Sequence, residues 1–332
     1  MKSAIQSEPA RAGGTLAYLP VALFGSIMGL SGLAVSWRIA HQHFGTPVWI
    51  ADAVSLTAVA SFALLLCAYL IKLLGSFDQV KAEFVHPIAG NMFGTLAISL
   101  LLIPLLLADN YLFLARLIWC IGAGAMLLLA WLIVTRWLSV RQQPLHATPA
   151  WIVPVVGMID IPLAVPALGW ALELHQLMVF ATAVGLFFAV PLFTIILSRL
   201  MFEESLPGAL QPSLLILVAP FSVGFSAYLA STGAVDGFAT ALYMLMLFIL
   251  AVLLTRLYHL RNCCPFRVSW WAVSFPLASS AVAALKYATF APSLFTDIVA
   301  ISLLALASLI IALLFVRTAV GIAGGELRSL SA

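Results

Sequence analysis

Charged residues are scarce in this sequence, and their scarcity excludes an ordinary soluble globular protein. Asp, Glu, Lys and Arg together make up 8% of the 332 residues, whereas a soluble domain has about 25%. Hydrophobic residues make up 64%, and the mean hydropathy is +1.15. The net charge of +3 is small and dispersed, so we expect no nucleic-acid surface. These features predict an integral membrane protein in contact with the lipid bilayer.

The sequence also lacks the patterns of a disulfide framework, a metal site or an active site. Its four cysteines are Cys67 and Cys120, inside apolar runs, and the adjacent Cys263 and Cys264. None has zinc-ligand spacing, and we find no catalytic triad, paired catalytic carboxylates or phosphate-binding loop. We therefore expect no enzyme activity, no cofactor and no metal. The first fourteen residues are polar, unlike a cleaved signal peptide.

Long apolar runs predict ten membrane-spanning helices, because roughly 18–25 apolar residues suffice to cross the hydrocarbon core. The predicted spans are 15–37, 48–72, 87–108, 111–138, 151–170, 175–198, 212–231, 236–258, 268–287 and 297–316. The fold class is therefore an all-α integral membrane protein. It has a single ten-span transmembrane domain at 15–317, a short N-terminal tail at 1–14 and a short C-terminal tail at 318–332.

The placement of basic residues predicts the orientation of these spans. With ten spans, both termini lie on one side of the membrane. Twelve of the 15 Lys and Arg residues fall on that side, namely Lys2, Arg11, Lys72, Lys81, Arg136, Arg141, Arg199, Arg256, Arg261, Arg267, Arg317 and Arg328. Because basic loops are retained in the cytoplasm, we predict cytoplasmic termini and a multi-pass protein of the plasma (inner) membrane.

Proline distinguishes the odd-numbered spans from the even-numbered ones. The odd spans contain Pro20, Pro104, Pro154, Pro162, Pro166, Pro220 and Pro276, whereas the even spans contain only Pro191 internally. In the first span, Gly25 and Gly29 share one face with Gly32. Bent helices are tolerated at membrane depth where protein or water covers the backbone. The pattern predicts five helical hairpins, each with a bent inner helix, around a central pore. Close small-residue packing is the alternative for each glycine.

The stretch SWWAVSFPLASSAVAALKYA, residues 269–288, combines an aromatic ring, a proline and a cation in the ninth span. Pro276 has no N–H, so we expect a bend that frees a backbone carbonyl in the middle of the helix. At about 100° per residue, Phe275, Ser279 and Lys286 fall on one stripe. A ring that occludes a narrow path, with a cation at its mouth, suits anions. Core packing for Phe275 and snorkelling for Lys286 are the alternatives.

Asp160 lies in the middle of the fifth span, in GMIDIPLAVPAL. A carboxylate at that depth is a functional candidate, and a proton-relaying Asp160 would favour coupled transport. The alternative is a structural ion pair with Arg116 of the fourth span, whose long side chain can cover the difference in depth.

Several of these segments resemble one family over essentially the whole chain. WWAVSFPLASSAVAALKYA resembles the ninth span of the plant slow-type anion channel and its bacterial relatives, in the tellurite-resistance/dicarboxylate transporter family. AEFVHPIAGNMF at 82–93 resembles the entry to the third span, and LPVALFGSIMGL and PSLLILVAPFSVGFSAYL resemble the first and seventh. The resemblance implies a homotrimer whose protomers each have a pore lined by the odd helices. It also implies that Phe275 occludes this pore and that Gly25 leaves room beside it.

Two functions remain open. The first is a gated passive channel for small anions such as chloride or nitrate. The second is a secondary carrier for a small organic anion such as malate, proton-coupled through Asp160, or a tellurite-resistance transporter. A carrier needs a deep site with a fixed cation, and no odd span has one at mid-depth, which favours the channel. The residues expected to line the pore or support its gate are Gly25, Gly29, Pro104, Pro162, Pro220, Pro276, Ser279 and Lys286.

Overall fold

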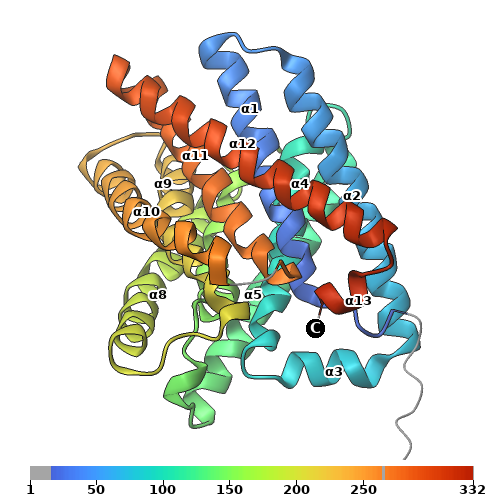
Figure 1. The fold of residues 1–332 in the computed structure, drawn as a ribbon. Coiled ribbons are helices and arrows are strands. Elements are labelled where there is room, and N and C mark those ends of the chain that lie inside the picture. The colour runs from blue at the N-terminus through green and yellow to red at the C-terminus, as the bar shows by residue number, and fades with distance from the viewer. Residues whose placement is uncertain (1–15, 264–265, 332) are drawn as a thin grey trace, which may run out of the picture.

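The computed structural model describes residues 16–263 and 266–331, and every regular element in them is helical. Nine helices in the described residues are long and apolar enough to cross a membrane, and most run side by side as one bundle (Figure 1). Their apolar cores are Val21–Phe44, Val48–Gly75, Ala89–Leu107, Leu112–Ser139, His175–Phe202, Gly208–Thr232, Gly237–Thr255, Val268–Phe290 and Leu294–Ala323. Nine of the predicted spans therefore correspond to long helices.

The fifth predicted span, 151–170, is a broken run of short helices instead of one long helix. The run Pro149–Ala164 consists of η4 (Pro149–Trp151), α6 (Val153–Val156), η5 (Gly157–Asp160) and α7 (Ile161–Ala164), where η denotes a 3₁₀-helix. Pro154 and Pro162 stand in the first turns of α6 and α7. A proline there needs no helical hydrogen-bond partner, but each one ends the regular helix that precedes it.

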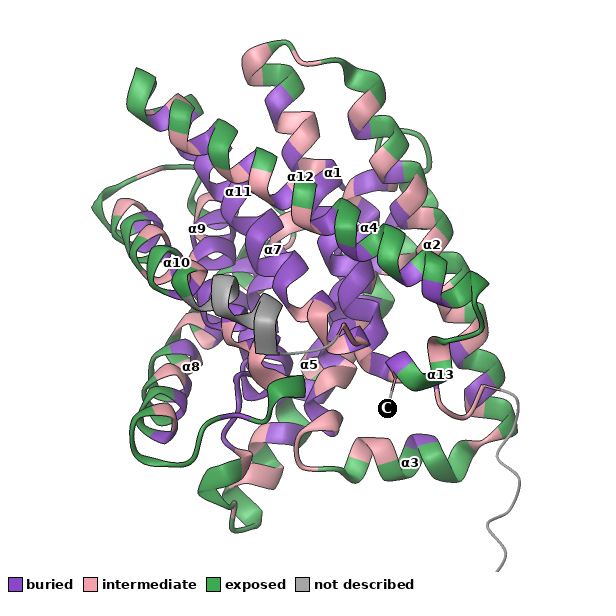
Figure 2. Cartoon of the chain, viewed as in Figure 1, coloured by how far each residue is buried: buried purple, intermediate pink, exposed green. Residues whose placement is uncertain are grey.

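Burial separates the long helices into an inner and an outer layer (Figure 2). In the apolar 18-residue window of each long inner span, between 67% and 83% of the residues are buried, against 22% to 39% in each outer one. The inner segments are η1 (Val21–Phe24) with α1 (Gly25–Phe44), η2 (Ala89–Met92) with α4 (Phe93–Leu107), the run η4 to α7, η6 (Gly208–Val218) with α9 (Ala219–Thr232), and η7 (Val268–Val273) with α11 (Ser274–Phe290). The outer helices are α2 (Val48–Gly75), α5 (Leu112–Ser139), α8 (His175–Phe202), α10 (Gly237–Cys263) and α12 (Leu294–Ala323). The two layers alternate along the chain, as the proline pattern predicts.

The five inner segments form a closed ring. Contacts run from α1 to α4, from α4 to α7, from α7 to α9, from α9 to α11 and from α11 back to α1. The 3₁₀-helices at their starts close the same ring, in the order η1, η2, η4, η6, η7 and back to η1. A ring of five helices leaves an axis that no helix occupies, and the side chains that point inward fill it.

Each inner segment begins as a 3₁₀-helix and continues as an α-helix, and this junction is where several prolines lie. Pro220 occupies the first turn of α9. Pro276 is the third residue of α11, directly after η7. The predicted break in the middle of the ninth span is therefore wrong. The missing N–H of Pro276 falls in a first turn, where no α-helical partner is required, so the proline marks the change of helix type.

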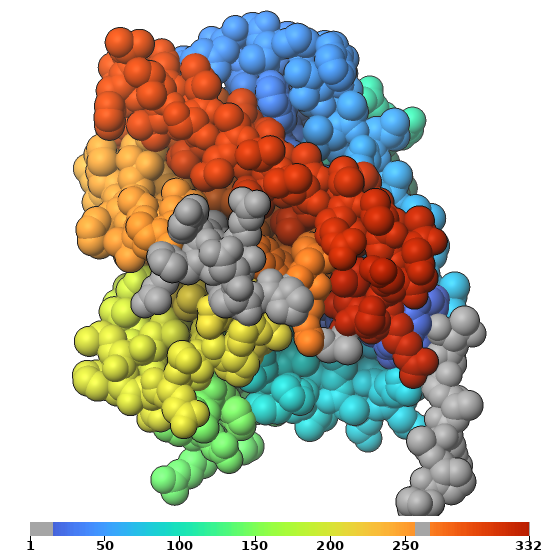
Figure 3. Space-filling model, viewed as in Figure 1, coloured from blue at the N-terminus to red at the C-terminus, as the bar shows by residue number. Residues whose placement is uncertain are grey.

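The outer helices present large apolar side chains to the outside of the bundle. Leu64 on α2, Phe187 on α8 and Leu309 on α12 are more than half exposed. In the space-filling view, the side chains of α12 form a diagonal band across one face (Figure 3). Such a surface is stable only in contact with lipid or with another apolar surface, so the protein is a multi-pass membrane protein.

Three short helices complete the fold, η3 (Pro144–His146), α3 (Phe77–Val85) and α13 (Leu327–Leu330). In the ribbon view α3 lies across one end of the bundle (Figure 1). Its Glu83 accepts hydrogen bonds from the Val21 backbone N–H at 2.7 Å, from Lys72 Nζ at 2.7 Å and from Tyr69 Oη at 3.2 Å. Lys72 also donates to the Leu19 carbonyl at 2.6 Å. This buried network fixes the start of η1 against α2 and α3.

Candidate functional site

Two small cavities lie inside the ring, and the side chain of Phe275 lines both. The first, which we call the Asp160 cavity, has a volume of about 60 Å³ and is lined by residues that include Gly25, Thr95, Asp160, Trp271, Phe275 and Pro276. The second, the Lys286 cavity, also measures about 60 Å³, and its lining includes Gly32, Val223, Ser226, Phe275, Ser279 and Lys286. Val223 also lines both cavities. Phe275 and Val223 together therefore separate the two spaces.

The Phe275 ring is held by its backbone neighbours on α11 and by close packing of α1. Phe275 is 7% exposed, and Ser274 before it donates a hydrogen bond to the carbonyl of Trp271 at 2.7 Å or of Gly25 at 3.2 Å. A Cβ added to Gly29 would overlap the Ser274 side chain. One added to Gly32 would lie 2.9 Å from Ala278 Cβ and 3.7 Å from the Phe275 ring. These glycines bring α1 close enough to fix the start of α11.

Gly25 and Gly29 therefore differ in what surrounds them. Gly25 lines the Asp160 cavity, and a Cβ there would lie 3.9 Å from the Trp271 carbonyl oxygen, an ordinary contact. Gly29 lines neither cavity and is a contact point between α1 and α11. The alternative interpretation of close small-residue packing applies to Gly29, whereas Gly25 borders open space.

Lys286 connects the second cavity to a wider one. The third cavity has a volume of about 620 Å³, is more open, and is lined by residues that include Gln42, Gly233, Lys286 and Thr289. Lys286 forms no hydrogen bond or ion pair with any residue in 16–263 or 266–331, and none of the residues that line the second or third cavity is acidic. A cation without a carboxylate partner leaves this end of the axis electropositive.

Two hydroxyl groups line the Lys286 cavity, those of Ser226 on α9 and Ser279 on α11. Ser279 Oγ is 2.7 Å from Ser222 Oγ and 3.1 Å from the Pro276 carbonyl oxygen. Ser226 lines the Lys286 cavity, is 3% exposed, and its Oγ has no hydrogen-bond partner among the described residues. An amine and a free hydroxyl that line one cavity provide donors for an anion and no charged acceptor for a cation.

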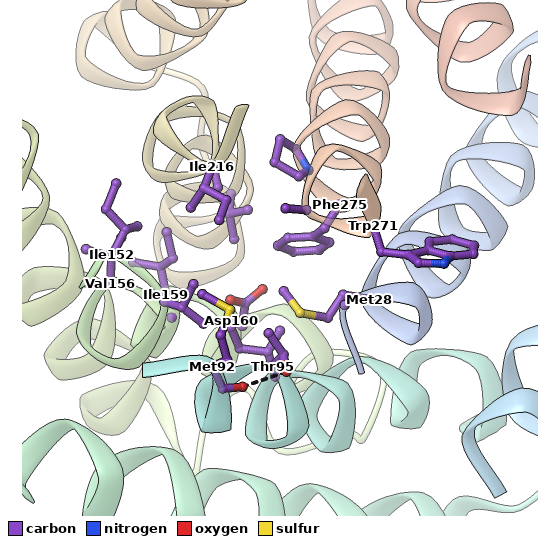
Figure 4. A pocket seen from close by; sticks show the side chains of 18 residues that line it. Met28, Met92, Thr95, Ile152, Val156, Ile159, Asp160, Ile216, Trp271 and Phe275 are labelled. Carbon is purple, nitrogen blue, oxygen red and sulfur yellow. Dashed lines mark hydrogen bonds between the residues drawn. The ribbon is translucent and has the colours of Figure 1, made fainter. Parts of the chain in front are cut away.

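Asp160 faces the Phe275 ring from the other side. It is the last residue of η5 and is 2% exposed, and its carboxyl group points into the first cavity toward Phe275 (Figure 4). Its Oδ1 has no hydrogen-bond partner, and no ion pair or hydrogen bond joins the Asp160 side chain to another part of the described chain. An ionised carboxylate buried without a partner is costly. Asp160 is thus an unsatisfied group beside the ring.

The ion pair between Asp160 and Arg116 is absent from the described residues, so that alternative is wrong. Arg116 Nε and Nη2 donate instead to the Leu168 carbonyl oxygen, at 3.1 and 2.8 Å. The guanidinium group also lies 4.7 Å from the centre of the Trp170 ring. Arg116 therefore stabilises the end of the broken fifth span, where Gly169 has φ 73°, and Asp160 is left without a cation.

Some of the residues predicted from the sequence line a cavity, and others do not. Gly25, Asp160, Phe275 and Pro276 line the first cavity, and Phe275, Ser279 and Lys286 line the second, as their common stripe predicts. Pro104, Pro162 and Pro220 line neither cavity; Pro104 lies inside α4, and Pro162 and Pro220 lie in the first turns of α7 and α9. Sequence reasoning missed Val223 and Ser226. Both lie on the seventh span, in the segment that resembles the family, but a lone valine and a lone serine in an apolar helix give no local signal that they line a cavity.

Comparison with known proteins identifies the chain. The sequence profile of the voltage-dependent anion channel family matches residues 18–319. The chain belongs to this family. The family is one of channels and transporters and not of enzymes, and it agrees with the resemblance in the spans.

Individual relatives of the chain include plant and bacterial proteins. The S-type anion channel SLAH3 of Arabidopsis thaliana is 30% identical over 311 residues, which cover 90% of this chain and 48% of the relative. The guard cell S-type anion channel SLAC1 of the same plant is 28% identical over 319 residues, which cover 90% of this chain and 55% of the relative. The tellurite resistance protein TehA homolog of Haemophilus influenzae is 28% identical over 275 residues, 81% of each chain. The chain thus spans about half the length of these two plant channels.

Proposed function

We propose that the protein is a gated passive channel for small anions such as chloride or nitrate, and that Phe275 is the gate. The observation that carries the proposal is the position of the Phe275 ring between two cavities on the axis of the closed ring. An apolar ring in a narrow passage keeps water and ions from passing between the two cavities. Displacing the ring would connect the Asp160 cavity to the Lys286 cavity and, through Lys286, to the open third cavity.

The side chains beyond the gate support a preference for anions. Lys286 has no acidic partner among the described residues, and Ser226 and Ser279 add hydroxyl groups to the same cavity. A conducting path must bind its ion weakly, and one cation with two hydroxyls at a partly open site provides weak binding. The names of the plant relatives as anion channels agree with this interpretation.

The proposal includes an arrangement in the membrane. Ten crossings, with the broken fifth segment as one of them, form five helical hairpins around a central pore, and both termini lie in the cytoplasm. The basic residues support this orientation. The family resemblance supports a homotrimer in which each protomer has its own pore, in the plasma membrane. The exposed apolar faces of the outer helices provide surfaces for both lipid and neighbouring protomers.

A secondary carrier for a small organic anion is the second candidate, and one observation favours it. Asp160 is buried, unpartnered and next to the gate, which is where a coupling proton would bind. A channel passes many ions at each opening and gives stepwise unitary currents, whereas a carrier does not. Recordings of the purified protein in planar bilayers distinguish the two candidates.

Charge reversal at Lys286 tests the anion preference. We expect Lys286→Glu to lower the chloride-to-potassium permeability ratio by about tenfold or more, which corresponds to about 1.4 kcal/mol, and Lys286→Gln to lower it less. The ratio is measured from reversal potentials in a Phe275→Ala background, so that the gate does not limit the current. An unchanged ratio in Lys286→Glu would show that ions do not pass this side chain.

A further inference from the structure

Asp160 places an acidic group inside a structure otherwise suited to anions. Among the described residues, it is the one ionisable side chain that lines the first cavity. Thr95 and Trp271 are the other residues with polar side-chain groups there. The Thr95 hydroxyl donates to the Met92 carbonyl at 2.6 Å or to the Val21 carbonyl at 3.1 Å, and Trp271 Nε1 donates to Thr318 Oγ1 at 2.9 Å. The carboxyl group therefore receives no hydrogen bond from the cavity wall.

Ionisable groups on the surrounding elements do not reach the cavity. The elements that pack against η5 and α7 or line the cavity carry Arg38, His41 and His43 on α1, Arg116, Cys120 and Arg136 on α5, His175 and Arg199 on α8, Tyr228 on α9, and Lys286 and Tyr287 on α11. None of these lines the first cavity. Arg116 and Arg136 bind the carbonyls of Leu168 and Val85, and Tyr228 donates to Asp236 at 2.6 Å.

The charge state of Asp160 decides whether an anion can occupy the same cavity. Two like charges about 5 Å apart, at an effective dielectric constant of about 20, repel strongly enough to lower occupancy on the order of 100-fold. The neutral acid has no such effect. Its O–H is a hydrogen-bond donor, and this donor has no acceptor among the residues that the structure describes, so it is free to bind an anion.

We propose that the Asp160 cavity binds one small hydrogen-bond-accepting anion together with one proton, which is held on the Asp160 carboxyl group. The proposal deepens the proposed anion path and rests on it. The cavity volume of about 60 Å³ exceeds the roughly 10–15 Å³ that one water molecule needs, so the cavity has room for a small anion such as chloride or nitrate. The acid donates its hydrogen bond to the anion directly beside the Phe275 ring.

The affinity of the cavity for the anion then depends on the proton, and its affinity for the proton depends equally on the anion, because linkage is reciprocal. Acidification raises the occupancy of the cavity by anions, and a higher anion concentration raises its affinity for protons. Anion flux through an open gate should increase as the pH falls. Flux should lose this pH dependence when residue 160 cannot ionise.

Nitrate flux into liposomes tests the proposal in the Phe275→Ala background, which removes the gate as a pH-sensitive step. We expect flux through this variant to rise at least tenfold between pH 8 and pH 5. Adding Asp160→Asn, which keeps the size of the side chain, should make flux vary by less than twofold and hold it at or above the acid level. The matched control is Asp52→Asn, which removes an exposed carboxylate of α2 and should leave the rise intact.

Infrared spectroscopy detects the proton on the Asp160 carboxyl group without a measurement of flux. The protein with native Phe275 should show a protonated carboxylic acid band that shifts when nitrate is added. The band should be absent from Asp160→Asn and present in Asp52→Asn. Because this measurement needs only folded protein, it remains informative where the double variant expresses poorly.

The two experiments separate failure of the inference from failure of the proposed function. Flux through Phe275→Ala that is independent of pH, or equally dependent on pH with Asp160→Asn, overturns the inference and leaves the anion path intact. Absence of flux in Phe275→Ala overturns the anion path, and the nitrate-dependent infrared band then decides the inference. A carboxylic acid band that does not respond to nitrate refutes shared binding of the proton and the anion.

Discussion

Replacing Phe275 with alanine should open the anion path through the protein and lower its free energy of unfolding only a little. A buried Phe→Ala change normally destabilises by about 3–5 kcal/mol, because the cavity it leaves stays empty. Here the ring already borders two cavities of about 60 Å³ each, and each is large enough for water. The space vacated by the ring merges with both and can hydrate, so we expect a loss of less than about 2 kcal/mol, below the range for a sealed core.

The change should act strongly on transport. A lowering of the barrier by about 1.4 kcal/mol raises a rate tenfold, and removal of an occluding ring should do at least this. We expect chloride efflux from liposomes to rise at least tenfold in Phe275→Ala, with Phe275→Leu intermediate. Stability is measured on the same preparations by thermal unfolding in detergent.

Phe225 provides the matched control. It is fully buried on the neighbouring helix α9, packs against Tyr243 and Tyr287, and lines neither cavity. Phe225→Ala should therefore show the full destabilisation of about 3–5 kcal/mol without a rise in efflux. The reasoning fails if Phe275→Ala is as destabilised as Phe225→Ala, or if it folds normally and conducts no more than the native protein.

Two further predictions concern packing. Gly29→Ala should destabilise the protein by about 1–3 kcal/mol, because the added methyl group overlaps Ser274 of α11. Gly25→Ala should leave the midpoint of thermal unfolding nearly unchanged. Equal midpoints for the two variants would contradict the packing described. Replacing Glu83 with Gln should destabilise by about 3–5 kcal/mol, because it leaves the buried Lys72 without its counter-charge. The companion double variant, with Lys72→Met as well, should recover part of this loss in the same assay, and no recovery would show that the pair is not coupled.

The all-helical fold was predictable from the sequence because apolar length and proline placement are local signals. Long runs of apolar residues define the spans, and the alternation of proline-rich with smooth spans corresponds to the inner and outer layers. The stripe of Phe275, Ser279 and Lys286 was predictable from helical periodicity, since α11 is regular over that stretch.

The features that the sequence predicted wrongly or missed depend on contacts between segments that are distant in sequence. The position of Pro276 in a first turn depends on η7, a 3₁₀-helix that periodicity does not reveal. The partner of Arg116 depends on the path of the chain after α7, where the Leu168 carbonyl is left free to accept. Ser226 carries no local signal, because a lone serine in an apolar helix usually bonds to its own backbone.

The central claim, that ions cross at Phe275 and that they are anions, is tested most directly by unitary currents of the purified protein in planar bilayers. Under a tenfold gradient of potassium chloride, we predict stepwise currents whose open probability or amplitude rises in Phe275→Ala. Their reversal potential should lie near that of chloride, about 59 mV in magnitude for a monovalent ion and opposite in sign to that of potassium. Reversal near the potassium potential, or no stepwise current in Phe275→Ala, would contradict the account.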